Sequence, residues 1–366
     1  MNSKSKQINW QTYLAKELPT ISSLLSDSGY SLQTDQPHLK GERAIIQSLT
    51  TQSGHKLILL GEKNEKKVVI KATGDKAGMA ELERERRCRL ALSNLNFAYD
   101  KFYAPREIEF IKRNGYVISV YEFIEQDSPF LDRPIAEQFT ISLRGFKIQE
   151  RARATTRKHF KKAANIFGER NSDKYKRLFT GFELFLQKEN VDKFILENVY
   201  KTKEKLHEGS QRIEQYCGFL THTDFVPHNF RVKNNVLYLL DFSSFILGNK
   251  HESWARFLNF MTLYNTELER LLIQYLEDNR APEERESLQL MRLFRLGELI
   301  TYHQDKVNKS TGDLQELSKV RVRFWNDVLA AELENRRVDR NIVERYKQTR
   351  DKLRSQEEKE RQIGLH

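Results

Sequence analysis

Residues 219–242, FLTHTDFVPHNFRVKNNVLYLLDF, set polar residues among apolar ones in a pattern that decides the fold. A proline within this stretch interrupts any regular element and predicts a tight loop that carries Asp224 and Asn229. The apolar run at 236–240 predicts a short buried strand, with Asp241 at its end. Oxygen ligands suit Mg²⁺, and a free carboxylate beside a cation can take a proton from a hydroxyl. The stretch therefore predicts a cation site next to a general base.

The composition favours a protein of two lobes in a reducing compartment. The chain has 366 residues, which is long enough for two cores, and no apolar run approaches the length of a membrane span. Its N-terminus is polar and lacks the apolar centre of a signal peptide. Cys88 and Cys217 are the two cysteines, too few for a disulfide framework or a cysteine zinc site. We therefore expect a cytoplasmic protein without a membrane span.

The net charge of +11 indicates a preference for anionic partners. Nucleotides, phosphorylated metabolites, nucleic acid and a membrane surface all fit, and many basic proteins are simply soluble basic proteins. The charge by itself selects none of these. A nucleic acid partner stays open here but is not favoured.

The first third of the chain predicts a helix followed by an antiparallel sheet. Helices are expected at 8–28, with a kink at Pro19, and at 76–95. Strands are expected at 44–51, 56–60, 68–72, 106–111 and 116–121. Lys71 is the charged residue in the third strand, where a lysine either reaches an edge or meets an anion.

Beyond residue 124 the pattern becomes helical. One or two helices are expected within 135–167, and further helices at 172–190, 191–216, 252–264, 267–278, 282–303 and 314–333. The stretch 143–163 is densely basic, and we treat it as one helix with a basic stripe. Residues 336–366 carry mixed charges and few apolar residues, which predicts an exposed helix or a frayed tail.

The loop and the order of elements resemble the aminoglycoside phosphotransferase and choline kinase families, the small-molecule branch of the protein-kinase-like fold. In those families a loop His-x-Asp-x-x-x-x-Asn precedes a strand that ends in Asp-Phe or a similar pair. Here these residues are His222, Asp224, Asn229 and Asp241-Phe242, and Val68-Val69-Ile70-Lys71 looks like the third-strand lysine motif of kinases.

The resemblance implies an α+β, two-lobed protein-kinase-like fold. Residues 1–124 would form a nucleotide-binding N-terminal lobe with a helix and a small five-stranded antiparallel sheet. Residues 125–335 would form a mainly helical C-terminal lobe with the catalytic loop and the acceptor site. Residues 336–366 would be a charged C-terminal helix or tail.

The resemblance also implies a role for each residue in the upstream half of the site. Lys71 would bind the α- and β-phosphates of ATP, and an acidic residue of the next helix would pair with it. Glu85 is our choice for this partner, and Glu81 is the second choice. The adenine would pair with the backbone of a hinge formed by Glu122, Phe123 and Ile124.

In the downstream half, Asn229 and Asp241 would coordinate Mg²⁺, which bridges phosphate oxygens and neutralises charge. Asp224 would orient the acceptor hydroxyl and accept its proton. His222 belongs to the catalytic loop, and we expect it to hold the loop by hydrogen bonds rather than to carry out chemistry. Ser253 stands where these families usually have an aspartate, which leaves the brace of the loop open.

The implied function is ATP-dependent phosphorylation of a hydroxyl on a small molecule. Because 143–163 is basic and falls where such kinases build the acceptor pocket, we expect an anionic or neutral acceptor such as a sugar; a solvated basic face is the alternative. Three other functions stay open: a catalytically silent kinase-like module, nucleotidyl transfer on the same scaffold, and a metal hydrolase with His222, Asp224 and His228 as ligands. Asp224 and Asn229 could also be an ordinary cap and turn residue.

Overall fold

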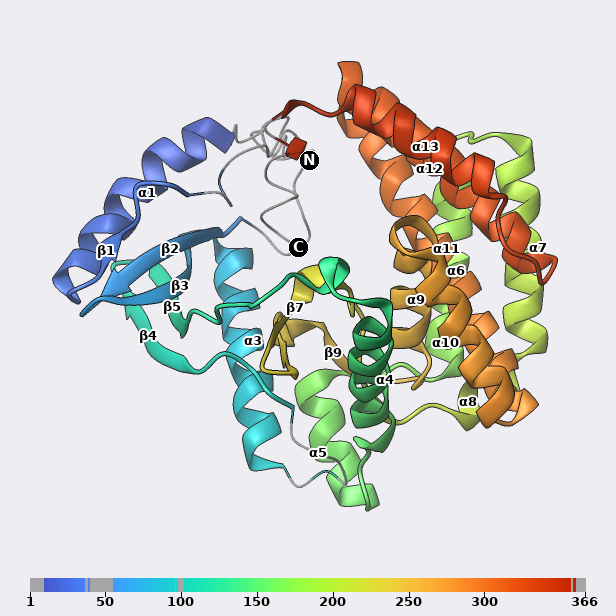
Figure 1. Cartoon of the computed structure of the whole chain (residues 1–366), viewed down its shortest axis with the longest axis horizontal. Coiled ribbons are helices and arrows are strands. Elements are labelled where there is room, and N and C mark those ends of the chain that lie inside the picture. Colours follow the sequence, from blue (N-terminus) through green and yellow to red (C-terminus); the bar gives the residue numbers. More distant parts are fainter. Residues whose placement is uncertain are drawn as a thin grey trace, which may run out of the picture.

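A computed structural model describes residues 10–36, 39, 55–95, 97, 102–356 and 358–359. The strand predicted at 44–51 lies outside these residues, as do the last residues of the predicted tail. Figure 1 shows a small sheet with a long helix on its outer side, and a larger helical body that lies beside it. The described helices include none that combines the length and the apolar character needed to cross a bilayer.

The N-terminal part contains five strands in one antiparallel sheet, in the order β1-β2-β3-β5-β4. These strands are β1 (Ser31–Leu32), β2 (Leu57–Lys63), β3 (Lys66–Thr73), β4 (Glu107–Arg113) and β5 (Tyr116–Glu122). The four strands predicted at 56–60, 68–72, 106–111 and 116–121 are confirmed within a few residues. The fifth described strand of the sheet is β1, at residues where no strand was predicted.

One face of the sheet packs on the helix α1 (Trp10–Asp27), because Ile21, Leu24 and Leu25 lie at helical spacing and meet the buried Leu59 and Ile70. Pro19 lies inside α1 without ending it.

The helix α3 (Lys76–Asn94) lies between the sheet and the helical body (Figure 1). Asp75 caps its N-terminus by accepting a hydrogen bond from the Gly78 N–H at 2.9 Å. A Cβ at Gly78 would lie 2.5 Å from the carbonyl oxygen of His55, so a glycine is needed for this close approach. Leu82, Glu85 and further residues at the same helical spacing form the buried face of α3. The sequence therefore places the Glu85 carboxylate inside the protein.

Most of the remaining chain is helical, as predicted. The helices are α4 (Ile135–Arg151), α5 (Arg157–Phe167), α6 (Ser172–Lys188), α7 (Lys193–Glu208), α8 (Ser210–Gln215), α9 (Glu252–Tyr264), α10 (Thr266–Asn279), α11 (Pro282–Lys309), α12 (Gly312–Leu333) and α13 (Arg340–Leu353). Short strands β6 (Phe219–His222), β7 (Phe230–Lys233), β8 (Val236–Leu239) and β9 (Phe245–Gly248) lie among them, with β6 paired to β9 and β7 to β8. Three 3₁₀ turns, η2 (Phe130–Asp132), η3 (Pro227–Asn229) and η4 (Phe242–Ser244), complete this part.

Of the one or two helices expected within 135–167 the structure has two, so the basic stretch 143–163 is not one continuous helix. The chain leaves the helical conformation between Arg151 and Arg157, because the Ala152 carbonyl accepts a hydrogen bond from the Leu220 N–H at 2.6 Å. Arg153 then forms a bridge to Phe219, so this segment extends the edge of β6. A second helix, α5, starts afresh after this segment.

The C-terminal helix is not an isolated exposed helix, contrary to expectation. Val343 and Tyr346 of α13 are buried against α12, and the Tyr346 ring stacks on that of Phe324 with centroids 4.1 Å apart. Val343 and Tyr346, with the partly buried Ile342, therefore dock a strongly charged helix on the core.

Candidate active site

Lys71 and Glu85 form an ion pair between the sheet and α3. β3 carries Lys71, and its Nζ lies 2.7 Å from both carboxylate oxygens of Glu85, whose side chain is fully buried. Arg89 adds a second cation 3.7 Å from the same carboxylate. Glu81, one turn earlier on α3, instead pairs with Lys56. Of the two acidic residues considered, Glu85 is thus the one that contacts Lys71.

The loop after β6 brings Asp224 and Asn229 together. The Asn229 side-chain N–H donates to the Asp224 carboxylate at 2.7 Å and to its backbone carbonyl at 2.9 Å. The η3 turn at Pro227–Asn229 closes the loop and directs the chain into β7. Because the Asn229 amide donates to Asp224, its carbonyl oxygen remains available to an external ligand.

His222 fixes the position of the strand end that carries Asp241. Its ring is fully buried, and Nε2 lies 3.0 Å from the carbonyl of Leu240 and 3.1 Å from that of Asp241. The Nε2–H tautomer can donate to these carbonyls. The Gln149 side chain accepts the backbone N–H of His222 at 2.7 Å. These contacts fit a residue that holds the loop.

Asp241 adopts a left-handed backbone conformation, with φ 52° and ψ 64°. The hydroxyls of Ser243 and Ser244 donate to its two carboxylate oxygens at 2.5 and 2.6 Å. Burial raises the pKa of this carboxyl, but the charge of Lys71, with smaller contributions from His222 and Lys56, lowers it to about 2. Asp241 is therefore ionised at neutral pH.

Arg256 on α9 is a site residue that sequence reasoning missed. Its Nε donates to the Asp224 carboxylate at 2.8 Å, and the Asp224 side chain is 39% exposed. Burial raises the pKa of Asp224, yet the charges of Arg256 and then Arg295 outweigh it and lower that pKa. No motif marks Arg256 in the sequence. Its position one turn after Glu252, in the segment that follows the Asp241 strand, was the only available signal.

At the start of α9, the carboxylate lies at Glu252, next to Ser253. The Ser253 hydroxyl is buried and has no hydrogen-bond partner among the described residues. Glu252 is fully buried and accepts hydrogen bonds from Tyr175 at 2.5 Å, Arg170 at 2.7 Å and Arg295 at 3.3 Å. The start of α9 is thus fixed by a carboxylate at position 252 rather than at position 253.

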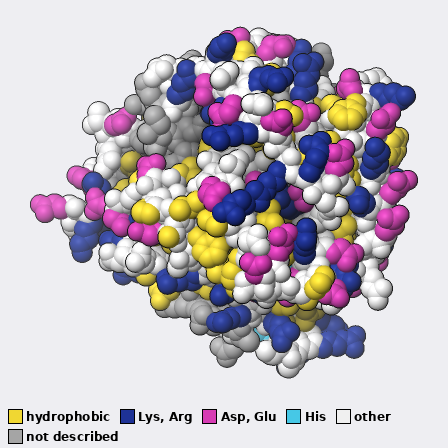
Figure 2. All heavy atoms as spheres, turned by 45° about the vertical axis from the view of Figure 1, so that its right-hand side comes forward, with side chains coloured by type: hydrophobic (Ala, Val, Ile, Leu, Met, Phe, Trp, Pro, Cys, Tyr) yellow, Lys and Arg dark blue, Asp and Glu magenta, His cyan; other side chains and the backbone are white. Residues whose placement is uncertain are grey.

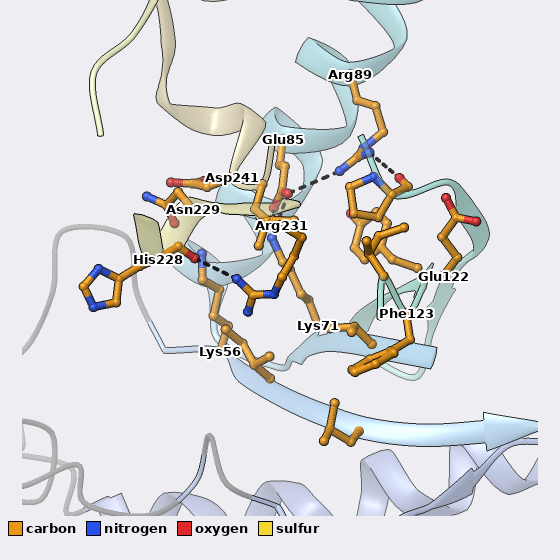
Figure 3. A pocket seen from close by; sticks show the side chains of 17 residues that line it. Lys56, Lys71, Glu85, Arg89, Glu122, Phe123, His228, Asn229, Arg231 and Asp241 are labelled. Carbon is orange, nitrogen blue, oxygen red and sulfur yellow. Dashed lines mark hydrogen bonds and ion pairs between the residues drawn. The ribbon is translucent and has the colours of Figure 1, made fainter. Parts of the chain in front are cut away.

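These elements enclose a cavity of about 330 Å³ between the sheet and the loop. Its lining includes seven of the predicted residues: Lys71, Glu85, Glu122, Phe123, Ile124, Asn229 and Asp241. Figure 3 shows the side of the cavity that carries Asn229 and Asp241 facing the side that carries Glu122 and Phe123. His222 does not line this cavity, and neither does Asp224.

Besides Arg89, the cavity is lined by two cations that the sequence did not single out, Lys56 directly before β2 and Arg231 from β7. The Arg231 guanidinium donates to the carbonyl of Phe230 at 2.9 Å, and burial lowers its pKa. In Figure 3 both side chains point into the same space as Lys71. On the opposite side, the backbones of Phe123 and Ile124 make no hydrogen bond to the described part of the chain. The side with Phe123 and Ile124 thus offers backbone donors and acceptors that have no partner in the described chain. The side with Lys56, Lys71 and Arg231 offers positive charge.

Residues of the stretch 143–163 contact the segment that carries Asp224, since Phe146 packs on Phe225 and Gln149 accepts a hydrogen bond from the His222 N–H. Lys147 and Arg151, at the C-terminal end of α4, line a separate cavity at the start of β6. The loop with Asp224 follows the other end of this strand. Neither Lys147 nor Arg151 lines the cavity that holds Asn229 and Asp241, and an acceptor role for the basic stretch stays a prediction.

Comparison with solved structures confirms the kinase-like fold. A thermostable mutant of aminoglycoside phosphotransferase APH(4)-Ia has 10% identity and a TM-score of 0.57, over 83% of this chain and 97% of that one. Aminoglycoside 2'-phosphotransferase-IIIa, solved as its GDP complex, has 12% identity and a TM-score of 0.57, over 85% and 98%. Macrolide 2'-phosphotransferase type I has 13% identity and a TM-score of 0.54, over 83% and 96%. No protein-family model matches the sequence, and no curated protein matches it.

Proposed function

We propose that this protein is an ATP-dependent phosphotransferase that phosphorylates a hydroxyl group of a small molecule. One observation carries the proposal: a single cavity is lined by the Lys71–Glu85 ion pair, by Asn229 and by the ionised Asp241. A cation fixed by a buried carboxylate, opposite a pair of oxygen ligands, is the arrangement that phosphoryl transfer requires. The fold that this protein shares with the compared phosphotransferases supports this chemistry.

The cavity suits a nucleoside triphosphate in both polarity and size. Lys56, Lys71 and Arg231 supply positive charge for the phosphates, and apolar side chains of β2, β3 and the hinge supply a surface for the base. The backbone groups of Phe123 and Ile124, which have no hydrogen-bond partner in the described part of the chain, can hydrogen-bond the edge of that base. The compared structures include complexes with ADP, AMP-PNP and GDP, which supports a nucleotide as a ligand of this protein.

Magnesium fits the residues present. The Asn229 carbonyl oxygen and the Asp241 carboxylate are hard oxygen donors, and the pKa of about 2 keeps Asp241 charged. When bound, the ion supplies charge neutralisation between phosphate oxygens. His222 positions Asp241 through its backbone carbonyl, and Ser243 and Ser244 orient the carboxylate.

Asp224 is the proposed base for the acceptor hydroxyl. Its pKa is lowered despite burial, so it is ionised and can accept the hydroxyl hydrogen. Asn229 and Arg256 hold the carboxylate by hydrogen bonds from two directions. The Arg256 guanidinium also places positive charge where the acceptor arrives, which favours an anionic or neutral, sugar-like acceptor over a cationic one.

The test is a screen of metabolite extracts with labelled ATP, using Asp224→Asn as the matched blank. Wild-type protein with γ-labelled ATP and Mg²⁺ should transfer label to a small molecule, and the variant should not. Label transferred from α-labelled ATP instead would show nucleotidyl transfer and contradict the proposal. If Asp224→Asn is as active as the wild type, Asp224 is not the base for the acceptor hydroxyl.

A further inference from the structure

A second cavity, of about 480 Å³, lies at the C-terminal end of α4. Five of its seven lining side chains are cationic, and they come from four places in the chain. The lining residues are Lys147, Glu150, Arg151, Arg153, Phe219, Lys250 and Arg280. It shares no lining residue with the first cavity, and the length of β6, roughly 10 Å, separates Phe219 from the loop that carries Asp224.

The backbone holds these cations in place. Arg153 lies on the extended segment that bridges to Phe219 at the edge of β6, so its Cα is fixed by the strand. Lys147 and Arg151 lie one turn apart on α4, and the Lys147 Nζ lies 5.7 Å from the centre of the Tyr275 ring. The cavity is thus built from a helix end, a strand edge and the loops at the ends of β9 and α10.

Carboxylates neutralise only part of this charge. Glu150 accepts hydrogen bonds from Trp254 at 3.1 Å and from Arg280 at 2.7 Å, and Glu284 accepts one from Lys250 at 2.7 Å. These two carboxylates pair with two of the five cations, Arg280 and Lys250. Within the described part of the chain, neither Lys147 nor Arg153 forms an ion pair.

The same place contains a group that could suggest a metal ion, Glu150, His251 and Glu284. Both carboxylates already bind cationic side chains, and the His251 Nδ1 lies 3.0 Å from the Ser287 hydroxyl. A metal ion would have to displace Lys250 and Arg280 from these carboxylates. The acidic residues therefore serve to anchor the cations.

We propose that this cavity binds a small anion that carries two or more phosphate groups. Several cations on a fixed backbone around a concave space match clustered phosphates, and arginines bind phosphate through paired N–H groups. A cavity of this volume exceeds what one phosphate fills. The site is independent of the proposed nucleotide site, and its occupancy can be measured without turnover.

A compact phosphorylated molecule fits better than the backbone of a nucleic acid. The cations converge on one cavity, and Lys250 and Glu150, with side chains 9% exposed, lie at its base. On the face seen in Figure 2, the described Lys and Arg side chains are interspersed with Asp and Glu. A nucleic acid would favour a continuous basic track instead.

Inorganic tripolyphosphate is a suitable probe, titrated calorimetrically into the full-length protein with saturating Mg-ADP to fill the first cavity. The double variant Lys147→Gln, Arg153→Gln should bind it about 10-fold more weakly or worse, because two charge-assisted contacts are lost. The matched control Lys188→Gln, Lys201→Gln removes the same charge from exposed positions on α6 and α7 and should bind as the wild type does.

Equal weakening in both variants would show only a net-charge effect and overturn the proposal. Wild-type protein that fails to bind tripolyphosphate would overturn it as well. Binding of single-stranded RNA that is lost in the cavity variant, without binding of tripolyphosphate, would assign the cavity to nucleic acid instead. Since Arg153 is exposed and neither changed residue has an ion-pair partner in the described chain, circular dichroism should show a folded variant.

Discussion

Replacing Lys71 by Met leaves the Glu85 carboxylate fully buried with its nearest cation removed. Breaking one partner of a buried ion pair typically costs about 3–5 kcal/mol, because the remaining charge has lost its compensation. Arg89 stays 3.7 Å from the same carboxylate, so we expect a loss at the lower end, about 3 kcal/mol. If Glu85 is also replaced by Met, the uncompensated carboxylate is removed while Arg89 keeps its hydrogen bond to the Pro105 carbonyl, and the double variant should lie within about 1 kcal/mol of wild type.

Urea denaturation at neutral pH measures these differences, and titration with Mg-ATP measures the functional part. Lys71→Met and the double variant should both lose nucleotide affinity, while only the single variant loses stability. Lys66→Met, an exposed lysine on the same strand, is the control and should change neither quantity. The reasoning would be refuted if Lys71→Met lowered the free energy of unfolding by less than about 1 kcal/mol. It would also be refuted if the effects of the two single substitutions on this free energy were additive.

Three further outcomes test other parts of the site and its surroundings. Arg256→Ala should raise the pKa of Asp224 and move the acid limb of the kcat/KM profile to higher pH; an unchanged profile would contradict the assigned contact. A hydrogen bond from His251, opposed by burial and assisted by Lys250, lowers the pKa of Glu284 from 4.5 to about 2. Its contribution to stability is complete above pH 4.5 and is lost as the pH falls toward 2, by up to about 3 kcal/mol. Denaturation at stepped pH should therefore show that the free energy of unfolding falls less between pH 4.5 and 2 in Glu284→Gln than in the wild type. An equal fall in both proteins would contradict the assigned pKa shift of Glu284. Ser253→Ala removes a buried hydroxyl without a partner in the described chain and should raise the free energy of unfolding by about 1 kcal/mol, visible as a higher Tm.

Local spacing in the sequence predicted the elements that carry the site. Lys71 lies on a strand whose apolar neighbours indicate its pairing, and Glu85 shares a helical face with Leu82, so both positions follow from periodicity. The order of strands and helices was enough to predict the fold, which the compared structures confirm.

The errors arose where contacts depend on distant parts of the chain. The helical pattern of 143–163 continues through Ala152, yet a hydrogen bond to Leu220 recruits this residue to a strand edge. Arg256 contacts Asp224 only because α9 packs beside β6, and nothing in the residues around it indicates which way its side chain points. The spacing of residues therefore predicts which side of a helix or strand is buried. It does not predict which other element packs against that side.

The left-handed backbone of Asp241 determines which substitution at this position makes a suitable inactive control. Alanine rarely adopts a positive φ, so Asp241→Ala would combine the loss of the carboxylate with backbone strain of about 1 kcal/mol. Asparagine is among the residues that enter this region most readily, and its amide oxygen can still accept a hydrogen bond from a serine hydroxyl. A comparison with Asp241→Asn would thus separate the loss of a charge from damage to the chain around it.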